Sequence, residues 1–262
     1  MQNVVRTHGQ APYHVAVLHG GPGAPGTVEP VARTLGACRG VLEPFQGAVT
    51  LQGQVDELRR QLLQCADFPV TLIGHSWGAW LAWILATQHP CMVQRLVLVS
   101  SGAFQEDYAA DLMDTRRARL SKEQRSEVND ILDQMAHEDG LRDDALLARF
   151  GALMSTADRY HPLPGEIATV TCDMEIFQGV WPEAADLRRK GQLLALGEQI
   201  CCPVVAIHGD HDPSPAEGVE KPLSPVLADF RFILLEKCGH SPWEERYARE
   251  PFYRELDRIL GT

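Results

Sequence analysis

Short runs of apolar residues recur along the chain, and segments with helical spacing separate them. The clearest runs cover residues 15–18, 70–73, 96–99, 204–207 and 232–235. They are continuous rather than alternating, which is typical of strands that other elements cover on both faces. Apolar runs that alternate with helical segments predict a mostly parallel sheet flanked by helices.

Three segments show the spacing of helices. Residues 54–65 form one apolar stripe at helical spacing, made of Val55, Leu58, Leu62 and Cys65. Residues 77–88 are apolar on nearly every side, which predicts a helix buried in the core. A last helix over about residues 243–260 is expected to close the chain.

The segment after the third apolar run contains no convincing strand. It is expected to form several helices, for example over residues 107–120 and 122–136. Helices inserted between two strands of a regular sheet are expected to form a lid. We therefore predict a core of residues 1–102 and 200–262, and a helical cap of residues 103–199.

Charge limits the kinds of partner. The chain has 262 residues, and its 24 basic and 35 acidic residues give a net charge of −11. Residues 103–199 hold 19 acidic and 11 basic residues, which is −8 of that charge. This balance disfavours nucleic acid and anionic membrane surfaces. We expect a small-molecule or short-peptide substrate, and the sequence does not predict the oligomeric state.

The pattern of cysteines and the lack of long apolar segments indicate in which cellular compartment the protein is expected. The seven cysteines are scattered, and the vicinal Cys201 and Cys202 suit neither a zinc site nor an ordinary disulfide. We expect reduced cysteines that pack as small apolar residues. No signal peptide and no membrane span is recognised, so we expect a cytoplasmic protein.

Residues 74–78 read Gly-His-Ser-Trp-Gly, a GxSxG motif between an apolar run and a helical segment. This context predicts a nucleophile elbow, in which Ser76 occupies a strained turn between a strand and a helix. Glycines two positions away let the strand and the helix approach each other. The turn places the hydroxyl at the carboxyl ends of the strands, where open parallel sheets bind ligands.

A glycine-rich segment, His-Gly-Gly-Pro-Gly at residues 19–23, follows the first apolar run. The lysine of a phosphate-binding loop is missing, and GxGxxG does not fit. We expect the backbone amide of Gly21, together with that of Trp77, to form an oxyanion hole.

A serine nucleophile needs a base, and the base needs an acceptor that orients it. His240 follows the run at 232–235, and Asp212 follows the run at 204–207, so both are expected at the same sheet edge as Ser76. The chain order Ser, Asp, His also fits an α/β-hydrolase arrangement.

Two other interpretations of the Asp212 region stay open. Asp210 competes with Asp212 for the acid's role, and we favour Asp212 because it lies further out on the loop. The histidines and aspartates at 208, 210, 211 and 212 also suggest a metal site, but adjacent residues rarely converge on one ion. We expect no metal and no cofactor, and we expect His19 to stabilise its loop by hydrogen bonding.

Together these segments resemble the α/β-hydrolase superfamily along essentially the whole chain. Within it, the HGGPG segment, the tryptophan after Ser76 and the GHSPWEE segment around His240 are similar to the proline iminopeptidase-like branch. The resemblance implies an α/β-hydrolase fold, with a helical cap inserted after the strand that follows the nucleophile helix. It also implies removal of N-terminal residues from short peptides.

In such relatives, carboxylates near the cap hold the free ammonium group of the substrate. The resemblance places this role on Glu183 or Asp186, with Glu175 as another candidate, and each of them also suits an exposed surface. Pro213 stands where some relatives have an acidic residue directly after the catalytic aspartate.

The sequence therefore predicts a serine hydrolase of small esters or amides that works through an acyl-Ser76 intermediate. An aminopeptidase of the proline iminopeptidase type is slightly favoured, because an acidic lid attracts cationic substrates. The alternative is a carboxylesterase or lactonase with an apolar lid pocket. A non-catalytic binding protein on the same fold is disfavoured, because no expected catalytic residue is missing.

Overall fold

The computed structural model describes residues 4–135, 143–164 and 171–261. Within these ranges seven strands form one sheet, in the order β1-β3-β2-β4-β5-β6-β7. Strand β1 runs antiparallel to β3, and the other neighbouring strands are parallel. The strands are β1 (Val5–His8), β2 (Val15–Leu18), β3 (Val41–Pro44), β4 (Val70–His75), β5 (Val93–Val99), β6 (Val204–Gly209) and β7 (Phe230–Leu235).

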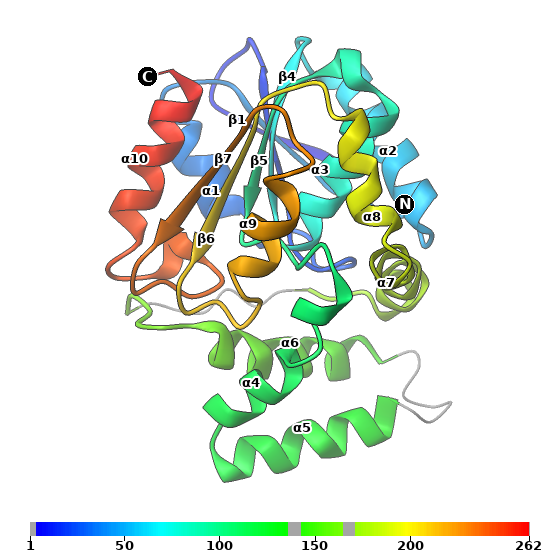
Figure 1. Cartoon of the computed structure of the whole chain (residues 1–262), viewed down its shortest axis with the longest axis vertical. Helices are drawn as coiled ribbons and strands as arrows, with labels where there is room; N and C mark the ends of the chain where they lie inside the picture. Colours follow the sequence, from blue (N-terminus) through cyan, green and yellow to red (C-terminus); the bar gives the residue numbers. More distant parts are fainter. Residues whose placement is uncertain (1–3, 136–142, 165–170, 262) are drawn as a thin grey trace.

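Helices cover both faces of this sheet (Figure 1). One face packs against α1 (Glu29–Leu35) and α10 (Arg249–Leu260), through side chains that include Val31 and Phe252. The other face packs against α2 (Leu51–Cys65), α3 (Trp77–Gln88), α7 (Met174–Arg189), α8 (Gln192–Ala195) and α9 (Glu217–Leu223). The predicted mostly parallel sheet with flanking helices is confirmed.

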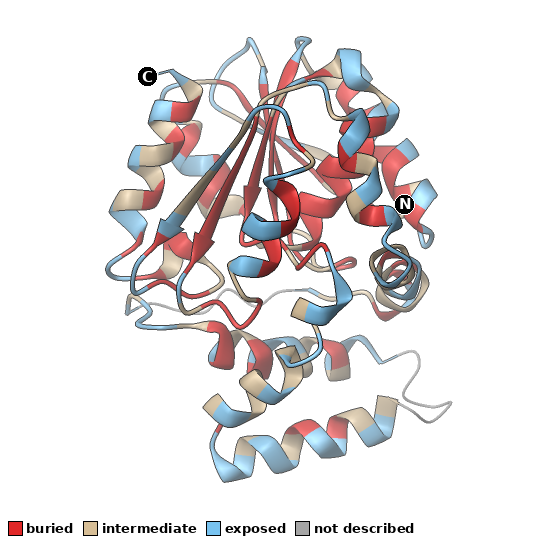
Figure 2. Cartoon of the chain, in the orientation of Figure 1, coloured by how far each residue is buried: buried red, intermediate tan, exposed pale blue. Residues whose placement is uncertain are grey.

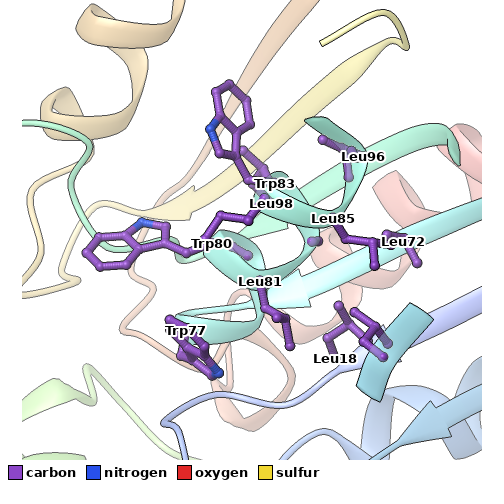
Figure 3. Close-up of a cluster of buried hydrophobic side chains, with 14 of the residues drawn as sticks. Leu18, Leu72, Trp77, Trp80, Leu81, Trp83, Leu85, Leu96 and Leu98 are labelled. Atoms are coloured by element: carbon purple, nitrogen blue, oxygen red, sulfur yellow. The ribbon is translucent and has the colours of Figure 1, made fainter. Parts of the chain in front are cut away.

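Alternate residues of one strand join the cores on opposite faces of the sheet. Val15 and Val17 pack with α1 and α10, whereas Ala16 and Leu18 pack with the helices of the other face. Burial on both faces explains why these strands are continuous apolar runs. Figure 3 shows part of the larger cluster, where leucines of the strands lie beside the tryptophans and leucines of α3.

Three helices form a separate layer at the edge toward which the parallel strands point (Figure 1). They are α4 (Leu112–Arg119), α5 (Lys122–Met135) and α6 (Asp144–Asp158). Their buried side chains form a cluster of their own, made of Leu120, Val128, Ile131, Leu153, Met154 and Ala157. Much of α5 is exposed to solvent (Figure 2). The segment predicted to be helical between residues 103 and 199 therefore contributes both this layer and the α7–α8 part of the main core.

The structure differs from the sequence-based expectation at several boundaries. Strands β1 and β3 were not expected, because Arg6 and the buried Glu43 interrupt their apolar pattern. The predicted start of the helix expected over 107–120 was wrong. A 3-10 turn at Glu106–Tyr108 comes first, and α4 begins at Leu112.

Helix α5 matches the helix expected over 122–136, except that residue 136 lies outside the described residues. The closing helix begins later than expected, at Arg249, because Pro242–Glu244 form a separate 3-10 turn. In the described part of the chain, no helix combines the length and the apolar character needed to cross a bilayer.

Candidate active site

Ser76 lies in a tight turn between β4 and α3, with φ 53° and ψ −115°. A positive φ is rare for a residue with a side chain and marks a strained backbone. A Cβ on Gly74 would lie 2.2 Å from the carbonyl oxygen of Gly78, and a Cβ on Gly78 would lie 2.5 Å from that of Leu18. Both glycines are therefore required by close backbone contacts, as the motif predicts.

The turn is anchored to the sheet while its serine side chain stays partly exposed. The backbone N–H of Ser76 donates to the carbonyl of Val99 in β5, at 3.0 Å. The Trp77 amide is the first of α3, so it has no acceptor within the helix. The N-terminal end of α3 therefore presents a free N–H, and a partial positive charge, beside the Ser76 hydroxyl.

The glycine-rich segment 19–23 lies directly against this turn. A Cβ on Gly20 would lie 3.3 Å from the Cβ of Ser76. Gly21 has φ +55°, a conformation that glycine adopts without strain. As expected, His19 bonds within the loop, with its Nδ1 3.0 Å from the carbonyl oxygen of Gly20. The loop thus places Gly20 close to Ser76, one residue before the Gly21 amide predicted for the oxyanion hole.

The imidazole of His240 is paired with Asp212. The His240 Nδ1 lies 2.7 Å from the Asp212 Oδ2, and the Asp212 side chain has no exposed surface. The Oδ1 of Asp212 accepts from the Ser214 N–H at 2.9 Å. Asp210 instead accepts from the Cys238 N–H at 3.0 Å. Of the two aspartates considered, it is Asp212 that contacts the histidine.

The charges of this pair stabilise each other. Burial alone would raise the pKa of Asp212, but the imidazoles of His240 and His208 outweigh it and lower this pKa to about 2. Burial alone would lower the pKa of His240, but the charge and hydrogen bond of Asp212 raise it above its usual 6.5. The carboxylate therefore favours an imidazole that gains a proton, as a general base must.

His75 connects the turn of Ser76 to His240. Its Nε2 donates to the backbone carbonyl of His240 at 2.9 Å, and the two rings lie 4.8 Å apart between centroids. Burial is the main cause that lowers the pKa of His75 to about 3, so this imidazole is neutral near pH 7. The ring next to the serine is therefore a fixed hydrogen-bond donor to the candidate base.

The backbone N–H of His240 is also held, by a residue of the α4–α6 layer. It donates to the carbonyl of Asp158, the last residue of α6, at 2.9 Å. The Asp158 carboxylate forms a bidentate pair with Arg116 of α4, at 2.8 and 2.7 Å. Sequence reasoning missed both contacts, because nothing in the local pattern links residues 158 and 240.

The acidic residues predicted to bind a substrate ammonium group lie on α7. Glu183 accepts from the Leu51 N–H at the start of α2, at 2.9 Å, and is exposed. Asp186 forms ion pairs with Arg189 of its own helix and with Lys190, which directly follows the helix. The partners of these two side chains are therefore residues other than Ser76, Asp212 and His240.

Glu175 occupies a different place on the same helix. It is exposed, and it lies two residues after Asp173, whose N–H donates to the carbonyl of Gly23 at 2.8 Å. The start of α7 therefore adjoins the glycine-rich loop, and Glu175 is the one of the three predicted acids that lies at this end.

Among the four candidate metal ligands at positions 208, 210, 211 and 212, the Nε2 of His208 lies 3.5 Å from the Oδ2 of Asp212. His208 is buried, and its Nε2 lies 2.8 Å from the Ser214 carbonyl oxygen, while the ring of His211 contacts that of Tyr160. Across residues 4–135, 143–164 and 171–261, no group of three or more histidine, cysteine, aspartate or glutamate side chains is arranged to hold a metal ion.

Comparison with known proteins gives a family match and many similar folds. Residues 8–250 match the family described as "Alpha/beta hydrolase family". No curated protein matches the chain. The crystal structure of VinJ is similar with a TM-score of 0.70 and 21% identity, and the match covers 98% of this chain and 93% of that one.

Two further solved structures are similar to a comparable extent. Proline iminopeptidase from Mycobacterium smegmatis has a TM-score of 0.62 and 20% identity, covering 98% of this chain and 93% of that chain. A structure from work on carboxylesterases of Nitrososphaera gargenis has a TM-score of 0.62 and 20% identity, covering 99% and 93%. At these identities the likeness concerns the fold.

Proposed function

The chain belongs to the alpha/beta hydrolase family, and on this premise we propose that it is a serine hydrolase acting on small esters or amides. The observation that carries the proposal is the strained turn of Ser76 beside a buried Asp212–His240 pair. A strained serine next to a free helix amide suits a nucleophile, and an imidazole oriented by a carboxylate suits its base.

In the proposed reaction, His240 takes the hydroxyl proton while the Ser76 oxygen attacks the substrate carbonyl carbon. The amides of Gly21 and Trp77 stabilise the negative oxygen of the tetrahedral intermediate. Collapse of the intermediate breaks the ester or amide bond, and His240 gives its proton to the leaving alcohol or amine. A water molecule then loses a proton to His240 and attacks the acyl-serine. His240 passes that proton to the leaving Ser76 oxygen, which releases the acid and restores the Ser76 hydroxyl.

The reaction identifies the bond that is cleaved but not the substrate. Glu175 supports an aminopeptidase, because an exposed carboxylate at the start of α7 lies near the loop that borders Ser76. It is therefore the candidate we retain for binding a substrate ammonium group. An esterase or lactonase would use the same nucleophile without that carboxylate, and it stays the alternative.

Active-site labelling tests the nucleophile. We expect a fluorophosphonate probe to label the purified protein, and Ser76→Ala to abolish labelling without unfolding the chain. Ser101→Ala is the matched control, because Ser101 is a buried serine just after β5 whose hydroxyl bonds to the Gly102 carbonyl. Continued labelling of Ser76→Ala would show that another residue is the nucleophile.

A small substrate panel tests the specificity. Turnover of prolyl and alanyl naphthylamides is compared with turnover of short-chain nitrophenyl esters. Cleavage of the naphthylamides, with a KM that rises in Glu175→Gln, supports the aminopeptidase. Activity on esters alone ends that interpretation and leaves the esterase.

A further inference from the structure

The carboxylate of Glu245 is a buried charge that the reaction above does not use. The residue is 0% exposed, and it accepts hydrogen bonds from three backbone amides. Its Oε1 accepts from Tyr160 at 2.7 Å and from Gly239 at 3.1 Å, and its Oε2 accepts from His161 at 2.7 Å. Hydrogen bonds to a charged acceptor are stronger than those between neutral groups.

These three amides belong to two segments that meet at the candidate base. Tyr160 and His161 follow the end of α6, and Gly239 directly precedes His240. A Cβ on Gly239 would lie 2.1 Å from the Asp158 carbonyl oxygen and 2.6 Å from the Glu245 Oε1. The backbone before His240 is therefore packed against both groups, with no space for a side chain.

The three hydrogen bonds to Glu245 require a charged carboxylate at this position. Burying a carboxylate is costly unless hydrogen bonds compensate it, and here three amides do so. In the described part of the chain, no cationic side chain forms an ion pair with Glu245. A glutamine would offer only one oxygen, and its NH₂ group would face a backbone N–H that also donates.

We propose that Glu245 is a positioning residue, which holds the Gly239 backbone so that the His240 imidazole keeps its contact with Asp212 and presents its free edge to Ser76. This inference rests on the proposed function, because it requires His240 to be the base. It assigns the carboxylate a role in catalysis that it performs through its neighbour, without touching the substrate.

The test compares Glu245→Gln with Glu244→Gln on the best substrate of the panel. Glu244 also binds the chain after α6, because it pairs with Arg159 at 2.7 Å, whereas the Gly239 N–H donates to Glu245. A misplaced catalytic group costs up to about 100-fold in rate. We expect Glu245→Gln to lower kcat by about 10- to 100-fold with KM within about twofold, and Glu244→Gln to change kcat by less than about twofold.

A pH profile separates positioning from a purely structural role. If His240 shifts away from Asp212, its apparent pKa in the profile of kcat/KM falls in Glu245→Gln and stays unchanged in Glu244→Gln. A folded Glu245→Gln with the wild-type kcat and pH profile overturns the proposal, as does an equal loss in both variants. If Glu245→Gln does not fold, Glu245→Asp takes its place. That variant keeps the charge but shortens its reach, and wild-type kcat in it also overturns the proposal.

His240→Ala is measured in the same series. Full activity of His240→Ala contradicts the proposed function itself, whatever the Glu245 variants do. Loss of activity in His240→Ala together with unchanged Glu245 variants contradicts the positioning role alone.

Discussion

The Nε2 of His75 lies 2.9 Å from the backbone carbonyl oxygen of His240. The residue before the candidate nucleophile therefore holds the candidate base, although 165 positions separate the two histidines. With the N–H of His240 bonded to Asp158 and its Nδ1 to Asp212, three separate segments hold this one residue. Its other ring nitrogen, Nε2, is therefore the atom left to accept a proton.

Folding stability should fall below pH 6.5 because His75 is buried as a neutral imidazole. Its pKa of about 3 in the folded state lies below the ordinary 6.5, so the unfolded chain binds a proton that the folded chain does not. Between these values the group costs about 1.4 kcal/mol of stability per pH unit. Urea unfolding between pH 6.0 and 4.5 measures the slope, and His75→Phe should reduce it by about that amount. An unaltered slope would mean that His75 is protonated in the fold.

The activity should decline on the acid side with a pKa above 6.5. Asp212 raises the pKa of His240, and a protonated imidazole cannot accept the Ser76 proton. Asp212→Asn should lower that apparent pKa and reduce kcat by about 10⁴-fold, as in other Ser-His-Asp triads. Profiles of kcat/KM from pH 5 to 9 check both effects. A wild-type profile that is flat down to pH 5 contradicts the assigned base.

Gly74→Ala and Gly151→Ala should have opposite effects on stability. The new Cβ at 74 would lie 2.2 Å from the Gly78 carbonyl oxygen, whereas nothing lies within 4 Å of a Cβ at 151 in α6. Overpacking costs about 1–3 kcal/mol, and alanine in a helix is favoured over glycine by about 1 kcal/mol. Chemical unfolding measures the stability of both variants, and equal stabilities would argue against a tight turn at Ser76.

The Arg116–Asp158 pair should matter most when only one partner is removed. The two side chains are 18% and 8% exposed, so Arg116→Met leaves a nearly buried carboxylate without its cation. Breaking such a pair costs about 3–5 kcal/mol, whereas replacing both partners by apolar residues is often tolerated. We expect Arg116→Met with Asp158→Leu to be more stable than Arg116→Met alone. Additive losses in a double-mutant cycle would show that the pair has no coupling.

The central strands could be predicted because burial on both faces leaves a plain signal. Val70, Leu72 and Ile73 are apolar, Thr71 is buried between them, and β4 begins at Val70. The edge strands gave no such signal. Glu43 is fully buried in β3 and lies 2.9 Å from the Nε2 of His8, a compensation that only the pairing of β1 with β3 provides.

The chemical groups of the site could be predicted, but not their supports. Ser76, Asp212 and His240 each follow a recognisable strand, so a shared sheet edge brings them together. The sequence does not distinguish Glu244 from its neighbour Glu245, although the first is partly exposed and the second is fully buried. Tertiary contacts decide such roles, and they join residues that are distant in the chain.

The positive φ of Ser76 also bears on how the chain came to have this residue. Glycine adopts φ 53° without strain, so selection for a durable fold alone would favour glycine at position 76. A serine at this position lowers the stability of the fold, and natural proteins tolerate such a loss where the residue has a function. Ser76→Gly should therefore yield a protein that unfolds at a higher temperature than the parent and has no hydrolase activity.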